Sequence, residues 1–181
     1  MLFFFFFFFY PGKNTLAMAQ GFIAFANKYP GKTNLLIAGT GPFASHISAL
    51  AAEHPCIQYL GQLPYVQIDD YIQKSHVVVC STLAEAFGMT IIEAMMLATP
   101  VLASAVGGPA EIVENGQTGW LVQGSPPEVW QQYFKSTYLF IHQHPDAYER
   151  IRKWAREKFL MHFQQHQQLA DLKQVILSDG Q

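Results

Sequence analysis

Six short apolar runs alternate with helical stretches along this chain, and that alternation constrains the fold more than any other feature of the sequence. The runs lie at residues 3–9, 34–38, 56–60, 76–80, 100–103 and 120–122, and helical spacing is found at 14–28, 43–53, 65–74, 89–97 and 108–114. The runs are apolar throughout, as is typical of strands buried on both faces of a parallel sheet. The pattern predicts an α/β fold, a doubly wound parallel sheet of about six strands.

The first of these runs is abnormal in composition. Seven phenylalanines, Phe3 to Phe9, follow Met1 and Leu2 and precede Tyr10. With no basic residues before it and no cleavage site after it, the run does not resemble a signal peptide. It is also far shorter than the roughly 20 apolar residues of a membrane-spanning helix. Two interpretations remain, a fully buried strand or a low-complexity artefact of a truncated reading frame. We favour a first strand position, residues 1–10, occupied by abnormal sequence.

The C-terminal part of the chain differs in composition and in predicted secondary structure. Residues 125–181 are rich in Gln, His and charge, contain no strand candidate, and include a long helical stretch over 146–177. We expect helices packed over the sheet, with Trp154, Phe159 and Phe163 on one side, and therefore a single domain over 1–181.

Composition excludes several classes of protein. The chain is 50% hydrophobic with a formal net charge of -2, which excludes a disordered chain and argues against a nucleic-acid partner. Cys56 and Cys80 lie in apolar runs and predict core thiols in a reducing, cytoplasmic compartment. His76 opens a strand and predicts a satisfied core histidine. His162 and His166 are spaced for a shared metal, but no third ligand accompanies them, so no metal site is expected.

The candidate ligand-binding residues lie after the fourth apolar run, residues 76–80. Glu85 ends a loop, Gly88 permits a tight turn, and a helix begins near Met89. The free amides of Gly88, Met89 and Thr90 would form an anion site suited to phosphate. Glu85 and Glu93 would flank the bound ligand and accept hydrogen bonds from hydroxyls, which suggests a sugar nucleotide. An ordinary solvated strand–loop–helix explains this spacing equally well.

Four motifs in register shift the balance toward the functional interpretation. Residues 85–104 read EAFGMTIIEAMMLATPVLAS, residues 107–113 read GGPAEIV, residues 115–122 read NGQTGWLV, and residues 35–42 read LLIAGTGP, with YLG at 59–61. Over about residues 11–165 the chain resembles the family-4 retaining glycosyltransferases, which adopt the GT-B fold of two Rossmann-like domains facing a cleft.

The resemblance implies a role for each matching residue. The chain would be the C-terminal, donor-binding half of a glycosyltransferase, a hexosyltransferase that needs no metal or other cofactor. Its donor would be a UDP-, GDP- or ADP-sugar. Glu85 would contact the transferred sugar and Glu93 the ribose, with the Gly88, Met89 and Thr90 amides at the diphosphate. The loop after Leu60 and Gly61 would hold the base, and Gly39 and Gly41 would let the backbone approach the nucleotide.

Two departures from the family pattern matter. The family places Gly-Arg before a lysine; Lys13 fits the lysine and would reach a phosphate, whereas Phe7 and Phe8 occupy the Gly-Arg positions. The N-terminal acceptor domain is also absent from these residues, so we expect a chain that is inactive alone. A missing domain or a partner chain would supply the unknown acceptor's site and any peripheral attachment to a membrane.

Two other functions stay open. The first is a non-catalytic nucleotide-binding or interaction module of the same fold. The second is another GT-B enzyme such as a sugar-nucleotide epimerase, which the spacing of Glu85 and Glu93 disfavours.

Overall fold

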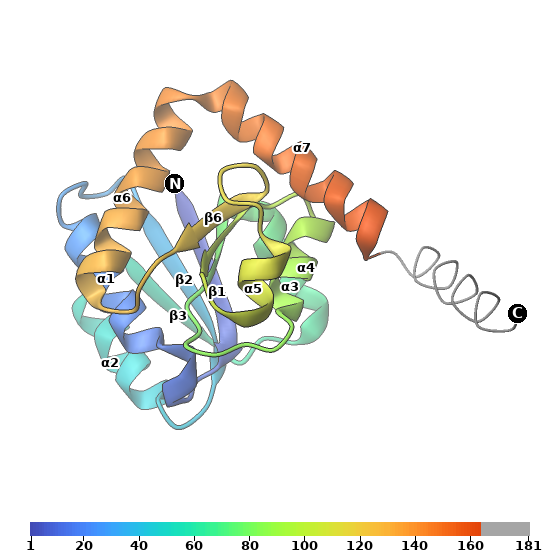
Figure 1. Cartoon of the computed structure of the whole chain (residues 1–181). Helices are drawn as coiled ribbons and strands as arrows, with labels where there is room; N and C mark the ends of the chain where they lie inside the picture. The colour runs from blue at the N-terminus through green and yellow to red at the C-terminus, as the bar shows by residue number, and fades with distance from the viewer. Residues whose placement is uncertain (164–181) are drawn as a thin grey trace, which may run out of the picture.

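A computed structural model describes residues 1–163 of the chain. Six parallel strands form one sheet in the order β3-β2-β1-β4-β5-β6 (Figure 1). The strands are β1 (Leu2–Phe8), β2 (Asn34–Thr40), β3 (Ile57–Gly61), β4 (Val77–Cys80), β5 (Val101–Ser104) and β6 (Gly119–Val122). The order reverses between β1 and β4, which is the switch point of a Rossmann-like doubly wound sheet and the place where ligands bind in such folds. The predicted fold class is confirmed.

Helices cover both faces of the sheet. They are η1 (Pro11–Lys13), α1 (Thr15–Ala26), α2 (Ala44–Glu53), α3 (Tyr65–Lys74), α4 (Met89–Met96), α5 (Gly107–Ile112), α6 (Pro127–Gln143) and α7 (Pro145–His162). One core joins the sheet to α1, α2 and α6, and a second core joins its other face to α3, α4, α5 and α7. The C-terminal helices thus pack over the sheet as predicted, α6 against α1 and α7 against α4 (Figure 1). No helix within residues 1–163 combines the length and apolarity needed to cross a membrane.

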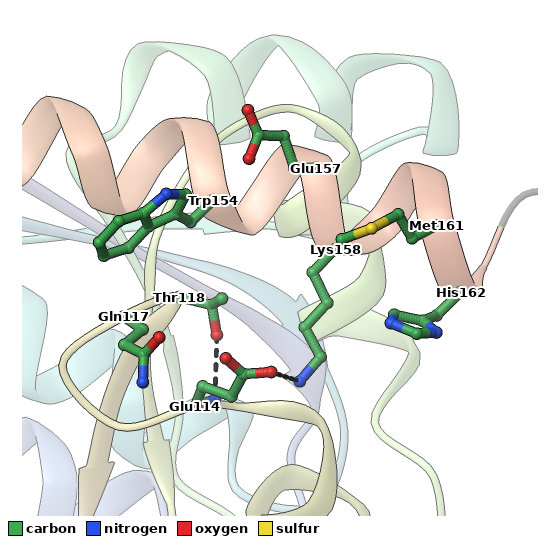
Figure 2. Close-up of a pocket in the computed structure, with 8 residues that line it drawn as sticks. All are labelled: Glu114, Gln117, Thr118, Trp154, Glu157, Lys158, Met161 and His162. Carbon is green, nitrogen blue, oxygen red and sulfur yellow. Dashed lines mark hydrogen bonds and ion pairs between the residues drawn. The ribbon is translucent and has the colours of Figure 1, made fainter.

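The predicted face of α7 is wrong in one respect. Phe159 and Phe163 pack against the second core, but Trp154 is 44% exposed and lies beside the loop between α5 and β6 (Figure 2). Five residues separate Trp154 from Phe159, and on a helix that spacing turns the side chain by about 140°. Ala155 occupies the buried position instead. The predicted helix beyond residue 163 lies outside the described residues.

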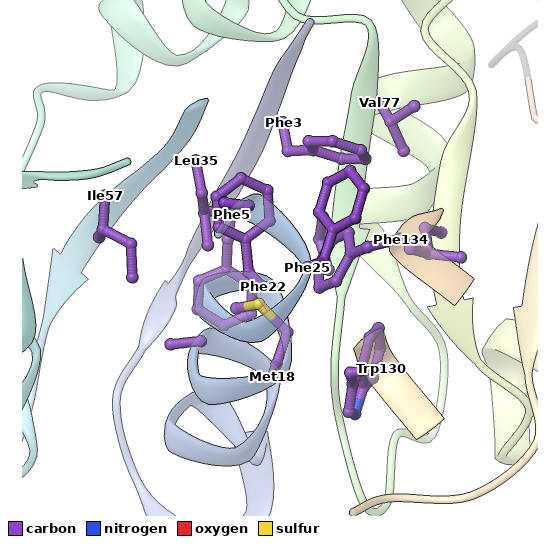
Figure 3. Close-up of a cluster of buried hydrophobic side chains, with 14 of the residues drawn as sticks. Phe3, Phe5, Met18, Phe22, Phe25, Leu35, Ile57, Val77, Trp130 and Phe134 are labelled. Atoms are coloured by element: carbon purple, nitrogen blue, oxygen red, sulfur yellow. The ribbon is translucent and has the colours of Figure 1, made fainter. Parts of the chain in front are cut away.

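The phenylalanine run forms the central strand of the sheet. Phe3 pairs with Leu35 of β2 and Val77 of β4. Successive side chains of a strand point to opposite faces, so Phe3 and Phe5 enter the core beneath α1 and α6 while Phe4 enters the other core (Figure 3). All three are fully buried, whereas Phe8 at the end of the strand is 58% exposed. The run therefore forms a strand that is buried over Phe3–Phe5 and exposed at its end.

Aromatic helix residues complete the packing around Phe3. The Phe3 ring meets Phe22 of α1 and Phe134 of α6 edge-on, with ring centroids 5.5 and 5.0 Å apart (Figure 3). Edge-to-face pairs are a favoured aromatic geometry that adds to the burial of apolar area. The large rings of β1 therefore match equally large partners on the helices that cover it.

Candidate functional site

Lys13 and Glu85, predicted as catalytic residues, meet at the carboxyl end of the sheet. Lys13 Nζ lies 2.5 Å from Glu85 Oε2, and the two side chains are 12% and 21% exposed. The Lys13 ammonium also lies 4.5 Å from the centroid of the Phe7 ring, within the range of a cation–π interaction. The pair therefore brings together the loop after β1 and the loop after β4, with Phe7 beneath the positive charge.

Buried hydroxyl groups hold these two loops together. Ser81 Oγ donates to the Lys13 carbonyl oxygen at 2.7 Å, and Thr82 Oγ1 donates to that of Gly12 at 3.2 Å. The Leu83 N–H donates to the same Gly12 oxygen at 2.7 Å. Ser81 and Thr82 are buried, and both act as hydrogen-bonding loop residues. They place the short η1 turn, and so Lys13, next to the loop that carries Glu85.

Asn14, the residue after Lys13, is of a type that often caps helix N-termini, but it does not cap α1. It occupies the position before α1, but its side chain makes no capping hydrogen bond to that helix. The Asn14 amide nitrogen instead donates to the Ser125 carbonyl oxygen at 2.9 Å. The side chain fastens the segment between β6 and α6 to the carboxyl end of the sheet.

Two glycines at the start of α5, Gly107 and Gly108, contact the backbone of the Glu85 loop and fix its position. The sequence did not predict this role for them. The Gly108 N–H donates to the Glu85 carbonyl oxygen at 2.9 Å. A Cβ on Gly107 would lie 2.1 Å from that oxygen, and one on Gly108 would lie 2.1 Å from the Phe87 oxygen. The loop thus packs directly on α5 backbone, which only a residue without a Cβ permits. The Gly-Gly pair after β5 is the feature of the sequence that indicates such a close backbone contact.

Gly108→Ala is expected to displace the loop over residues 83–88 and to lower the free energy of unfolding by about 1–3 kcal/mol, because the new methyl group has no room. Urea denaturation measures the stability, and backbone amide NMR shifts report the loop. Gly116→Ala is the control: its φ of +78° strains alanine, yet nothing lies within 4 Å of its Cβ. If both variants left the amides of residues 83–88 unshifted, the seating of this loop by Gly108 would be refuted.

The start of α4 presents free backbone donors, as predicted. Gly88 precedes the helix with a φ of +100°, and its carbonyl oxygen accepts from the Ile91 and Ile92 amides at 2.9 and 3.4 Å. The first amides of an α-helix, here those of Met89 and Thr90, have no intrahelical acceptor. The helix dipole adds partial positive charge at the same point. This helix start therefore favours an anion.

Glu93 lies one turn into α4 and has a partner that the sequence did not predict. Tyr65 at the start of α3 donates its hydroxyl to Glu93 Oε1 at 3.3 Å. Burial raises the pKa of the Glu93 carboxyl, an effect that the Tyr65 hydrogen bond opposes and the charge of Asp69 reinforces. The negative charge of Glu93 in turn raises the pKa of Tyr65. Nothing in the spacing of Tyr65 and Glu93 signals this contact, which depends on how α3 and α4 lie on the sheet.

The remaining predicted residues lie at the ends of β2 and β3. A Cβ on Gly39 would lie 1.8 Å from the Phe7 carbonyl oxygen, and one on Gly41 would lie 2.5 Å from that of Phe9. These glycines therefore have a packing reason within the chain itself, since Gly39 lets β2 pass close to the end of β1 and Gly41 lets the residue after β2 pass close to the residue after β1. Leu60 packs against the second core and Gly61 adopts a φ of +68° where β3 ends. Contact of any of them with a ligand remains a prediction.

A cavity of about 220 Å³ opens beside the Glu85 loop. Its lining residues come from the loops after β4, β5 and β6: Thr82, Leu83, Ser104, Ala105, Val106, Val122, Gly124 and Ser125. None of these was predicted as a ligand-binding residue. The cavity lies at the same end of the sheet as Glu85, where the three loops diverge.

Other titratable residues lie away from this site. Cys80 is buried, and burial raises the pKa of its thiol to about 12, as a core cysteine requires. His76 is exposed rather than in the core, and it accepts a hydrogen bond from the Leu2 N–H at 3.2 Å. Desolvation and the nearby N-terminal amino group lower the pKa of His76. Within residues 1–163 no three His, Cys, Asp or Glu side chains form a metal cluster, and His166 lies outside those residues.

Comparison with known proteins shows which family this chain matches. A family model described as glycosyl transferases group 1 matches residues 20–158. D-inositol 3-phosphate glycosyltransferase of Streptomyces scabiei is 42% identical over 64 residues, which are 35% of this chain and 14% of that protein. The chain therefore spans a small part of its curated relatives.

Solved structures share the fold over nearly the whole chain. Anabaena HepE, crystallised with UDP and glucose, superposes with a TM-score of 0.79 at 19% identity over 98% of this chain and 48% of HepE. The C-terminal domain of the group 1 glycosyl transferase LpcC from Francisella tularensis gives a TM-score of 0.76 at 18% identity, over 91% of this chain and 87% of that domain. The described residues thus correspond in fold to one domain of such structures.

Proposed function

The chain belongs to the glycosyl transferases group 1 family, and from this premise we propose that it is the donor-binding half of a retaining, metal-independent glycosyltransferase. Its ligand is a nucleotide-diphosphate sugar. One observation carries the proposal: the helix start at Gly88, the carboxylates of Glu85 and Glu93 and the ammonium of Lys13 all lie at the carboxyl end of the sheet.

Each part of the donor has a chemical counterpart at this edge. The Gly88, Met89 and Thr90 amides bind the diphosphate, because free N–H groups and the helix dipole both favour negative charge. Glu93 accepts hydrogen bonds from the ribose, and the main chain after Leu60 and Gly61 holds the base, close to Gly39 and Gly41. HepE is described in complex with UDP, which favours uridine among the possible nucleosides.

The Lys13–Glu85 pair performs two tasks in this proposal. Glu85 accepts hydrogen bonds from hydroxyls of the transferred sugar, while Lys13 turns toward the phosphate and stabilises the charge that develops on the leaving diphosphate. In the structure each residue neutralises the other across 2.5 Å. Donor binding therefore exchanges part of this ion pair for contacts with sugar and phosphate.

UDP is expected to raise the melting temperature of the chain in a saturable manner, because a ligand that binds the folded state alone stabilises it. Differential scanning fluorimetry with UDP, GDP and ADP measures the shift and ranks the bases, and uridine without phosphate serves as the control ligand. The proposal fails if well-folded protein shows no shift with any nucleotide diphosphate at millimolar concentration.

Residues 1–181 alone are expected to bind donor and transfer no sugar. Transfer requires donor and acceptor to be held together, a contribution of up to roughly 7–11 kcal/mol, and the residues at this edge supply the donor side. UDP release from UDP-glucose, with and without a fused acceptor domain from a related enzyme, measures transfer. Robust release by the unfused chain would contradict this part of the proposal.

The second candidate, a non-catalytic nucleotide-binding module, is favoured by the environment of Lys13. Phe7 and Phe8 stand where the family has Gly-Arg, and Lys13 is already engaged by Glu85 and the Phe7 ring. Changing Phe7 and Phe8 to Gly and Arg in the fused protein separates the two candidates. Transfer that appears only with the Gly-Arg change would indicate a module that has lost catalysis. The family match favours either over an epimerase.

A further inference from the structure

A second cavity lies at the opposite end of the sheet from Glu85. It has a volume of about 180 Å³ and opens between α7 and the loop that joins α5 to β6 (Figure 2). Its lining residues are Glu114, Gln117, Thr118, Trp154, Glu157, Lys158, Met161 and His162. Thr118 directly precedes β6, so the cavity lies at the amino end of that strand. Neither the proposed donor contacts nor the core of the chain involves it.

One wall of this cavity is an indole. Trp154 is 44% exposed, while Trp130 is fully buried in the first core. Figure 2 shows the Trp154 side chain on the side of α7 that faces Gln117 and Thr118. A flat aromatic face that stays in contact with water beside a cavity can take up an apolar ligand surface of matching shape.

The opposite wall carries fixed polar groups. The Glu114 carbonyl oxygen accepts from the amides of Gln117 and Thr118, both at 2.9 Å, and the Glu114 N–H donates to Thr118 Oγ1 at 3.0 Å. Lys158 of α7 donates to Glu114 Oε1 at 2.5 Å. The loop is thus preorganised by its own hydrogen bonds, and preorganised donors and acceptors bind at a lower entropic cost.

The charges around the cavity narrow the choice of ligand. Lys158 is paired with Glu114, and Glu157 points away from the loop in Figure 2. No unpaired lysine or arginine among the described lining residues would attract a phosphate or carboxylate. The lining carries two carboxylates, Glu114 and Glu157, against the one ammonium of Lys158, and this excess of negative charge disfavours an anionic ligand. A neutral, polyhydroxylated ring with one apolar face can stack on the aromatic plane and donate hydroxyl protons to these carboxylates.

We propose that this cavity binds a pyranose unit of a neutral saccharide, which stacks on Trp154 and hydrogen-bonds to Gln117 and to the Glu114–Lys158 pair. The site is separate from the donor site and does not depend on the proposed function. A saccharide held here would lie outside the reaction centre, so the site would anchor a glycan to the chain.

Titration of the full chain with maltose, cellobiose and N,N′-diacetylchitobiose tests the proposal, with saturation-transfer NMR and iodide quenching of tryptophan fluorescence as readouts. We expect saturable binding of at least one disaccharide with protection of Trp154 from iodide. Trp154→Ala should weaken that binding at least about fivefold, and the matched Trp154→Phe, which keeps an aromatic face, should weaken it less. Because Trp154 is exposed, neither variant opens a cavity in the core, and thermal melts verify folding.

Two controls separate this site from the donor site. Glu93→Ala should leave saccharide binding unchanged, and UDP should not displace the saccharide. Absence of binding by all three disaccharides at millimolar concentration would overturn the proposal. So would displacement by UDP, equal affinity of the Trp154→Ala variant, or a dimer whose formation depends on Trp154, since the last would assign this surface to a second copy of the chain. Failure of UDP to bind would leave this site untouched.

Discussion

Phe3→Ala is expected to lower the free energy of unfolding by about 3–5 kcal/mol, a large part of the roughly 5–15 kcal/mol that stabilises a typical domain. Phe3 is fully buried in the central strand and contacts aromatic rings of α1 and α6. Removing its ring leaves a cavity that β2 and β4 on either side cannot close without breaking their register. Urea denaturation followed by circular dichroism measures the loss.

Phe8→Ala is the matched control for Phe3→Ala. It makes the same chemical change in the same strand, but Phe8 is 58% exposed. The Phe8→Ala variant should therefore lose no more than about 0.5 kcal/mol in free energy of unfolding. Equal losses for the two variants would mean that β1 does not lie in the core as described.

Glu93→Ala is expected to weaken UDP binding about tenfold to a hundredfold, the range for losing a hydrogen bond to a charged group. Glu85→Ala should leave UDP affinity unchanged or raise it, because Lys13 then loses its partner and is free to meet a phosphate. With UDP-glucose as ligand, Glu85→Ala should lose affinity, since the sugar is now present. Isothermal titration calorimetry of both variants with both ligands measures these four affinities.

Glu93→Gln serves as the isosteric control in this comparison. It keeps the size of the side chain and one oxygen acceptor but removes the charge, so its UDP affinity should fall between those of the parent and Glu93→Ala. If Glu85→Ala and Glu93→Ala weakened UDP equally, the separate ribose and sugar roles would not stand.

The order and bounds of most elements follow from the sequence. Predicted bounds lie within about two residues of those observed for most strands and helices, and those of α3, Tyr65–Lys74, agree at both ends. This succeeded because parallel strands are apolar on both faces and are separated by helices of ordinary length. The predicted face of α7 is wrong at Trp154, because a separation of five residues from Phe159 turns the side chain by about 140° around the helix.

The contacts between residues of the candidate site could not be predicted from the sequence. The sequence predicts a binding role for Lys13 and for Glu85 separately. Their contact depends on the hydrogen bonds from Ser81 and Thr82 to the loop after β1. The Tyr65–Glu93 hydrogen bond likewise depends on how two helices lie on one face of the sheet. Such contacts join residues through the tertiary packing of loops and helices, which no local pattern encodes. The Gly107–Gly108 pair is evident in the sequence, but its contact with the backbone of the Glu85 loop is not.

The central position of β1 has a consequence for the chain during synthesis. Phe3 pairs with Val77, so one edge of β1 stays unpaired until β4 has left the ribosome, roughly 4–15 s later at ordinary elongation rates. During that interval an uncharged, β-prone segment of phenylalanines is exposed, and such segments associate readily with one another. Chaperone supply and translation speed should therefore control the soluble yield of this protein more strongly than the stability of its finished fold.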